Sequence, residues 1–146
     1  MSLNAVDRYF GKYRGAVTDN DDPAKLGRIR AIVPSVLGAD TSDWAAPCLP
    51  FATPGVGFFF VPPVDAGVWI EFEGGDPRLP IWTGCFWREG ELDEFEPGTC
   101  LIAIRNQYAS IVLDENGGGS IVLEHDSGAR IVVDVSGVAI EGAETE

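Results

Sequence analysis

A ten-residue repeat in the last third of the chain constrains its fold more than any other feature. Segments rich in Ile and Val recur at Ser110–Asp114 (SIVLD), Ser120–Glu124 (SIVLE) and Arg130–Asp134 (RIVVD). The spacers between them carry Gly, Asn, Asp and Ser, which favour turns. Degenerate copies lie at 101–104 and 138–140. A fixed period of this kind predicts five-residue strands arranged either as a meander or as a β-helical coil.

Side-chain alternation along these strands places one set of apolar residues on a single face. A lone sheet would leave that face in water, so the tail needs a partner, and identical copies are the simplest one. Three such sheets facing one another make a triangular prism with the acidic residues outside. We therefore expect a trimer core formed by Ile111, Leu113, Ile121, Leu123, Ile131 and Val133.

A second β-rich region precedes the repeat, between Phe58 and Gly84. Alternate residues of Val68–Phe72 share one face of an expected strand. The sequence Gly74–Pro77 is a turn signal, because glycine allows positive φ and proline fixes its own φ. Another strand is expected at Leu79–Trp82. Two strands joined by Gly-Gly-Asp-Pro predict a hairpin in a small all-β domain.

Further strands are expected upstream, at Tyr13–Thr18, Gly27–Val33 and Trp44–Pro47. In the second of these, alternation places Ile29, Ala31 and Val33 inward. Residues 1–12 are expected to hold a short helical turn, docked on the domain by Tyr9 and Phe10.

The acidic segment Glu89–Pro97 is typical of a linker. We therefore predict two parts, a domain with its linker at 1–97 and a β-repeat tail at 98–146.

The charge of the chain bears on its partners. The formal net charge is −13, divided into −3 over residues 1–90 and −10 over residues 91–146. Because an acidic chain repels phosphate, this balance disfavours nucleic-acid binding. Arg28 and Arg30 share the outward face of one strand, yet no aromatic residues interleave with them as stacking requires. We expect them to form ion pairs with Glu71 and Glu73 on a neighbouring strand.

Candidate metal ligands are few. Asp19–Pro23 is rich in Asp and Asn but lacks the Gly and Glu of an EF-hand loop, so it predicts a turn. Cys48, Cys85 and Cys100 have no metal-ligand spacing and are expected to be buried free thiols.

A hydrolase with paired carboxylates is the enzymatic alternative. Glu71, Glu73 and Asp76 are its candidates, and the first two are expected to share a strand face. His125 is the only histidine, and no Ser/His/Asp or Cys/His set with plausible catalytic roles exists around it. We therefore expect that the protein is not an enzyme.

Three segments, Asp22–Arg30 (DPAKLGRIR), Trp44–Pro47 and 58–84, also carry a resemblance in their residues and order. Together they resemble the oligonucleotide/oligosaccharide-binding (OB) domain of contractile-tail central spike proteins. That family includes phage baseplate spikes, the spike core of type VI secretion proteins and spikes of extracellular contractile injection systems. The resemblance covers roughly residues 13–88, and a compositional likeness continues to the end of the chain.

The resemblance implies an N-terminal OB-fold barrel followed by a tail that forms a trimeric β-prism or β-helix. It implies a structural function, in which a homotrimeric needle docks on the tail hub through the OB domain and pierces a target envelope. The chain carries neither the hub-like segment of type VI spikes nor the lysozyme domain of some phage spikes. We therefore expect a separate hub protein, and contact with the target membrane only on firing.

The end of the chain bears on the spike tip. Some family spikes end in an apex where paired histidines hold iron, and residues 136–146 contain no histidine. We therefore expect no cofactor and no bound metal, and a small PAAR-repeat tip protein as the cap. Its expected contacts are Val138, Ala139, Ile140, Glu141 and Gly142.

No signal-peptide core and no apolar run near the ~20 residues of a membrane span is present. We expect assembly in a bacterial cytoplasm and delivery as part of a virion or injection particle. The alternative function is a free OB module that binds oligosaccharide or single-stranded nucleic acid, which a basic groove with exposed stacking aromatics would indicate.

Overall fold

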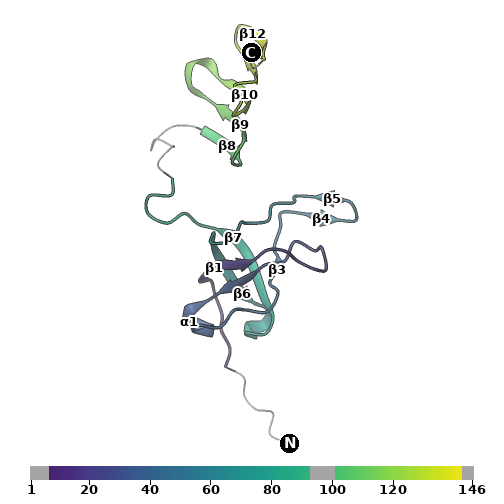
Figure 1. Cartoon of the computed structure of the whole chain (residues 1–146), viewed down its shortest axis with the longest axis vertical. Helices are drawn as coiled ribbons and strands as arrows, with labels where there is room; N and C mark the ends of the chain where they lie inside the picture. Colours follow the sequence, from purple (N-terminus) through teal and green to yellow (C-terminus); the bar gives the residue numbers. More distant parts are fainter. Residues whose placement is uncertain (1–6, 93–100, 143–146) are drawn as a thin grey trace, which may run out of the picture. The chain divides into compact units, whose positions relative to one another are not determined.

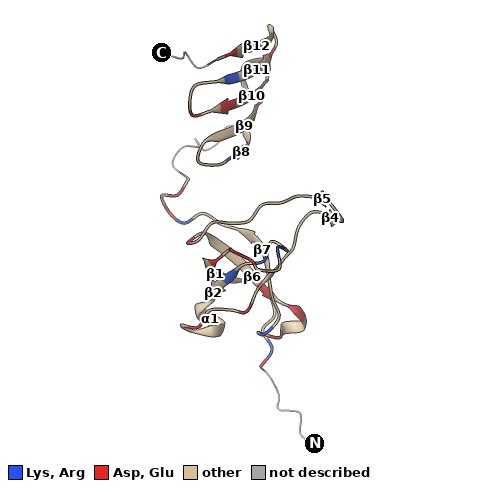
Figure 2. Cartoon of the chain, turned by 45° about the vertical axis from the view of Figure 1, so that its right-hand side comes forward, with Lys and Arg blue, Asp and Glu red and all other residues tan. Residues whose placement is uncertain are grey.

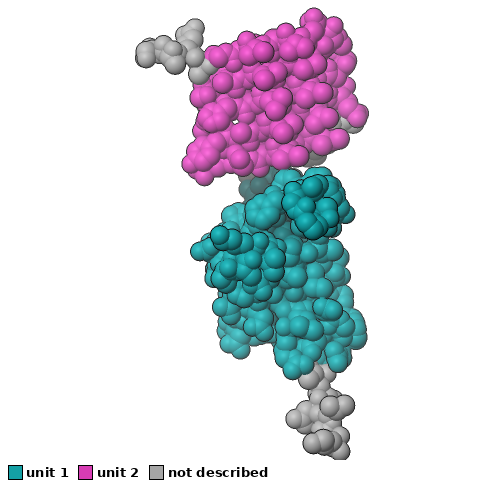
Figure 3. Space-filling model, turned by 90° about the vertical axis from the view of Figure 1, so that its right-hand side faces the viewer, with its two compact units in different colours: residues 1–92 teal, residues 93–146 magenta. Residues whose placement is uncertain are grey.

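The structure is a computed structural model that describes residues 7–92 and 101–142. It divides into two compact units, residues 1–92 (unit 1) and 93–146 (unit 2), shown in Figure 3. The boundary expected after residue 97 lies outside the described residues and stays a prediction.

Unit 1 is built mostly of short strands (Figure 1). In chain order its elements are β1 (Tyr13–Asp19), β2 (Arg30–Ile32), α1 (Pro34–Leu37), β3 (Ala46–Pro47), β4 (Ala52–Thr53), β5 (Val56–Gly57), β6 (Gly67–Phe72), the 3-10 turn η1 (Glu73–Gly75) and β7 (Pro80–Cys85).

Five of these strands form one sheet that closes on itself. The strand order is β2-β1-β6-β7-β3, with β3 parallel to β7 and the other pairs antiparallel. Ile29 and Ala45, the residues just before the two outer strands, exchange backbone hydrogen bonds of 3.2 and 2.7 Å. Because this bridge joins the two edges, the sheet becomes a small five-stranded barrel, the OB-like architecture expected from the sequence.

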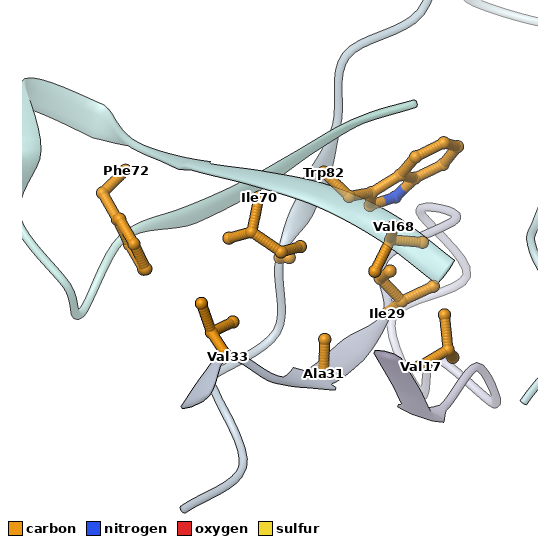
Figure 4. Packing of buried hydrophobic residues seen from close by; sticks show 9 residues of the cluster. Val17, Ile29, Ala31, Val33, Val68, Ile70, Phe72 and Trp82 are labelled. Carbon is orange, nitrogen blue, oxygen red and sulfur yellow. The ribbon is translucent and has the colours of Figure 1, made fainter. Parts of the chain in front are cut away.

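The barrel interior holds the buried core of unit 1 (Figure 4). The expected inward set of the second strand, Ile29, Ala31 and Val33, is fully buried. The Trp82 indole N–H donates to the Gly27 carbonyl at 3.1 Å, so its polar atom is satisfied inside the barrel. The remaining core residues are Val17, Ala45, Val68, Ile70 and Phe72.

The Gly-Gly turn after β6 receives the segment that precedes β1. Gly75 has a φ of +75°, and a Cβ there would lie 3.1 Å from the Phe10 ring and from the Tyr9 backbone nitrogen. The Tyr9 N–H donates to the Gly75 carbonyl, and its ring packs against Phe72. The expected docking by Tyr9 is confirmed, whereas Phe10 stays largely exposed. Residues 7–12 form no helical turn, and residues 1–6 lie outside the described range.

The expectation of buried thiols is wrong for two cysteines. Cys48 and Cys85 are free and exposed: Cys48 directly follows β3, and Cys85 is the last residue of β7. Cys100 lies outside the described residues.

Unit 2 is a single antiparallel sheet. Its elements are β8 (Leu101–Arg105), β9 (Ala109–Asp114), the 3-10 turn η2 (Asn116–Gly118), β10 (Ser120–His125), β11 (Arg130–Asp134) and β12 (Gly137–Glu141). Neighbours in sequence are neighbours in space, in the order β12-β11-β10-β9-β8. Within one chain the tail is therefore the meander, one of the two arrangements predicted. The trimeric β-prism or β-helix stays a prediction.

Candidate functional site

The sheet of unit 2 has one continuous apolar face. Directly paired residues of neighbouring strands lie on the same side of a sheet. The register therefore forms two columns across all five strands. One column is Ile102, Leu113, Ile121, Val133 and Val138, and the other is Ile104, Ile111, Leu123, Ile131 and Ile140.

All six residues expected in a trimer core lie on this face, on the three central strands β9 to β11. Their exposed fractions are 38–43%. The four added by the outer strands β8 and β12, at 52–77%, are more exposed because each has a neighbouring strand on one side only. The degenerate repeat copies at 101–104 and 138–140 were the sequence signal for these four.

The opposite face is mixed in character. Its central column holds the smaller residues Ala103, Val112, Val122, Val132 and Ala139. A flanking column carries mostly charged residues, with Arg130 Nε 3.5 Å from a carboxylate oxygen of Glu141. Lys, Arg, Asp and Glu of this sheet are coloured in Figure 2. The two faces therefore differ in chemistry: one carries the two apolar columns, with His125 paired to Ala109 at its margin, and the other carries the charged residues.

The turns of the meander fix this register. Four residues that end strands or begin turns accept a hydrogen bond from the backbone N–H two residues further on: Asn106, Asp114, His125 and Asp134. Side chains that bond their own backbone in this way stabilise tight turns. Since a slip of one residue would turn every apolar side chain to the other face, these turns maintain the apolar columns.

The expected tip contacts lie at one edge of the sheet. Val138, Ala139, Ile140 and Glu141 belong to β12, the outermost strand, and Gly142 follows it. All five are exposed. Val138 and Ile140 belong to the apolar columns, while Ala139 and Glu141 lie on the other face. In the described part of the chain nothing pairs with the outer side of β12, which leaves strand hydrogen-bonding groups open to a partner.

The carboxylates considered for hydrolysis do not form a cluster. Glu71 forms an ion pair with Lys12 at 2.9 Å, and Asp76 forms one with Arg78 at 2.6 Å. Glu73 lies in η1 rather than on β6, so it does not share a strand face with Glu71 as expected. Among residues 7–92 and 101–142, no group of three or more His, Cys, Asp or Glu side chains is placed to hold a metal ion.

The expected ion pairs of Arg28 and Arg30 are wrong. Arg28 binds Asp22 at 2.6 Å, because the Asp22–Gly27 loop folds back on β2, and Arg30 donates to the Ser42 carbonyl at 3.0 Å. Both guanidinium groups lie over the Trp44 ring, 5.6 and 5.9 Å from its centre. Trp44, which lies just before β3, therefore accompanies both arginines, although no aromatic residue interleaves with them in their own segment.

Asp22 is the organising residue of this loop. Its carboxylate also accepts backbone N–H bonds from Ala24, Leu26 and Arg28 at 2.8–3.2 Å. The Arg28 guanidinium and these amides hold the pKa of the Asp22 carboxyl well below its usual range. Asp22 and Arg28 thus serve the loop structure. A turn does form at the end of the expected range 19–23, at Pro23–Ala24, whereas Asp19 still belongs to β1.

In the parts of the chain that the structure describes, none of the helices has the length and apolar character to cross a bilayer. Comparison with known proteins bears on unit 1. No curated protein matches the chain. A family model, described as the type VI secretion system/phage-baseplate injector OB domain, matches residues 13–87. That range is just over half of the chain, and it contains the whole barrel from the start of β1 to the end of β7. The chain therefore belongs to the family of type VI secretion system and phage-baseplate injector OB domains.

Proposed function

We propose that this protein is the central spike of a contractile injection machine and that it works as a homotrimer. Membership of the injector OB-domain family supports a structural role related to a phage or type VI secretion baseplate. Family membership alone does not imply a trimer, a spike or a piercing action. We infer these from the sheet of unit 2.

The main support for the proposal is the apolar face of unit 2, which is formed by the ten side chains of the two apolar columns. Each of these Ile, Leu and Val side chains is at least 38% exposed in the single chain. A contiguous patch of this kind marks a surface that another molecule covers. Because only one face is apolar and the other carries charges, three copies with their apolar faces inward would give a prism with a dry interior and a wet exterior.

In this arrangement each part of the chain has a mechanical task. The OB-like barrel docks on a tail hub protein, and the sheets form the shaft that the contracting sheath drives into a target envelope. A shaft with an apolar core and a charged surface contacts the target membrane only on firing. We propose no catalytic role, and a place in a virion or injection particle assembled in the bacterial cytoplasm.

A small cone-shaped PAAR-type tip protein is the proposed cap of the shaft. The outer side of β12 supports this proposal, because Val138 and Ile140 are 69% and 77% exposed beside unpaired strand groups. Image reconstruction of assembled particles tests it: density beyond residue 146 at the apex is expected, and an apex that ends there would exclude a cap. The isolated protein should contain no stoichiometric iron or zinc by elemental analysis.

Light scattering of the purified full chain tests the trimer. A mass of three chains is expected across micromolar concentrations, since nothing in the described part of the chain covers the apolar face. A folded monomer at those concentrations would contradict the proposal. Folding must be checked by circular dichroism in the same sample, so that an unfolded monomer is not mistaken for a folded one.

A further inference from the structure

A second apolar surface lies on unit 1, on the hairpin formed by β4 and β5. We name residues 51–60 the aromatic hairpin. It lies within a stretch, Trp44–Val64, that contains no charged residue, in a chain with 23 Asp and Glu. Figure 2 shows the hairpin extending from the barrel without a coloured residue. Among the described strands, β4 and β5 pair only with each other and take no part in the five-stranded sheet.

The hairpin holds its rings in a fixed array. The Phe51 and Phe58 rings meet edge to face at 5.3 Å, and Phe58 stacks on Phe60 at 5.7 Å. The strands approach so closely that a Cβ on Gly57 would lie 2.9 Å from the Phe51 carbonyl oxygen. At the base, the Asn20 side chain donates to the Pro62 carbonyl at 3.1 Å. The ring contacts and the close pairing of β4 with β5 therefore hold the aromatic surface together within the hairpin itself.

This surface faces solvent in the single chain. Phe51, Phe58, Phe59 and Phe60 are 49%, 42%, 78% and 51% exposed. Together these fractions correspond to about two whole phenylalanine side chains, on the order of 400 Å² of apolar surface. An aromatic patch of that size marks an interaction surface.

The area also limits which partner can cover it. A stable interface of standard size buries about 800 Å² on each partner, roughly twice what the aromatic hairpin offers. The hairpin is therefore suited to a partner that a second, separate interface already binds to the same chain. Copies of this chain, joined through the apolar face of unit 2, meet that requirement, because tethering raises the effective concentration of their barrels to about the millimolar range.

We propose that the aromatic hairpin packs against unit 1 of a second copy of the chain. The inference rests on the proposed trimer and adds a contact between the barrels. Each copy carries the same uncharged aromatic surface, so hairpins of neighbouring copies can form aromatic pairs without burying a charge. The barrels would then be fixed to one another at the end of the assembly that docks on the hub.

Photo-crosslinking of the full chain tests this contact. Phe59 is replaced by p-benzoylphenylalanine, since it is the most exposed ring and makes neither of the two ring contacts described above. The matched control carries the same replacement at Leu79, which is 50% exposed and lies outside the hairpin. Irradiation should give covalent dimers and trimers for the position 59 protein and none for the control. Mass spectrometry should locate the cross-link within residues 7–92 of the second chain.

The outcomes separate this inference from the proposed function. A trimer by light scattering without cross-linking at position 59 would overturn the hairpin contact and leave the trimer intact. Cross-links that end in residues 101–142, or equal cross-linking in the control, would also overturn it. A monomer would overturn the trimer and the inference together. Co-sedimentation with phosphatidylcholine vesicles that is lost in Phe59→Ser would identify lipid as the occupant and contradict a second copy.

Discussion

Asp22 and Arg28 form a short ion pair, with Arg28 Nη2 2.6 Å from Asp22 Oδ1, at the point where the loop after β1 enters β2. The Asp22 side chain is only 4% exposed, although the pair lies at the border of the barrel. The same carboxylate binds three backbone amides, so one side chain orders the whole turn.

The first prediction concerns the pH dependence of unit 1. The pKa of Asp22 is lower in the folded chain than the value of about 3.9 in an unfolded one. The ionised carboxylate therefore stabilises the fold above about pH 4, and this contribution is lost as the pH falls further. Denaturant titrations at a series of pH values should show the midpoint falling in acid. Asp22→Asn should have a lower midpoint at pH 7 and a flatter acid dependence.

Asp76 provides the comparison for that experiment. The Arg78 side chain lowers the pKa of Asp76 in the same direction, so Asp76→Asn should remove a separate part of the acid dependence. If neither variant changed the slope with pH, the ionised carboxylates would not be stabilising unit 1.

The second prediction concerns the seat of the N-terminal segment. Gly75→Ala adds a Cβ at a positive φ and 3.1 Å from both the Phe10 ring and the Tyr9 nitrogen. Backbone strain of this kind costs about 1–3 kcal/mol, and the clash adds to it. The free energy of unfolding of unit 1 should fall by at least that amount in denaturant titration.

Gly74→Ala is the matched control. Gly74 has a φ of +57° in the same turn, but only the Arg8 guanidinium lies near its Cβ position, at 3.9 Å. Both variants carry strain and only Gly75→Ala carries the clash. Equal losses would show that the contact with residues 9 and 10 contributes nothing.

The sequence predicted the elements whose signals are local. The repeat predicted strands at 110–114, 120–124 and 130–134, and the structure has β9, β10 and β11 within one residue of them. Both signals, the alternation of apolar residues along a strand and the turn residues between strands, can be recognised in a sequence window of about ten residues. The inward positions of Ile29, Ala31 and Val33 follow from the same alternation.

What the sequence did not predict depends on distant neighbours. The Ile29–Ala45 bridge and the Asp22–Arg28 pair depend on loops folding back, which no local pattern encodes. The composition of the apolar run Phe58–Phe60 does not tell whether its rings are buried or exposed. Only the structure shows that they are exposed on a hairpin.

The third prediction is that residues 1–97 fold alone. The buried core residues of the described chain all lie between Val17 and Trp82, inside unit 1. The fragment should give a β-type circular dichroism spectrum and a cooperative unfolding transition, and it should associate only weakly in light scattering. Absence of β-structure would reject the predicted boundary, whereas a tight trimer would assign assembly to unit 1.

The fourth prediction is that Ile121→Asp prevents assembly of the full chain. Ile121 is central in one apolar column, between Leu113 and Val133. In a trimer three carboxylates would meet in a dry interior without partners, at a cost on the order of several kcal/mol for each buried charge.

Val122→Asp is the matched control, since the adjacent residue lies on the opposite face of the same strand. That variant should still have the mass of three chains in light scattering, with a melting temperature reduced by lost packing on Val112 and Val132. Ile121→Asp should appear as a monomer in which unit 1 keeps its own unfolding transition. If both variants stayed trimeric with unchanged melting, the face that carries Ile121 would not be the one that meets the other copies.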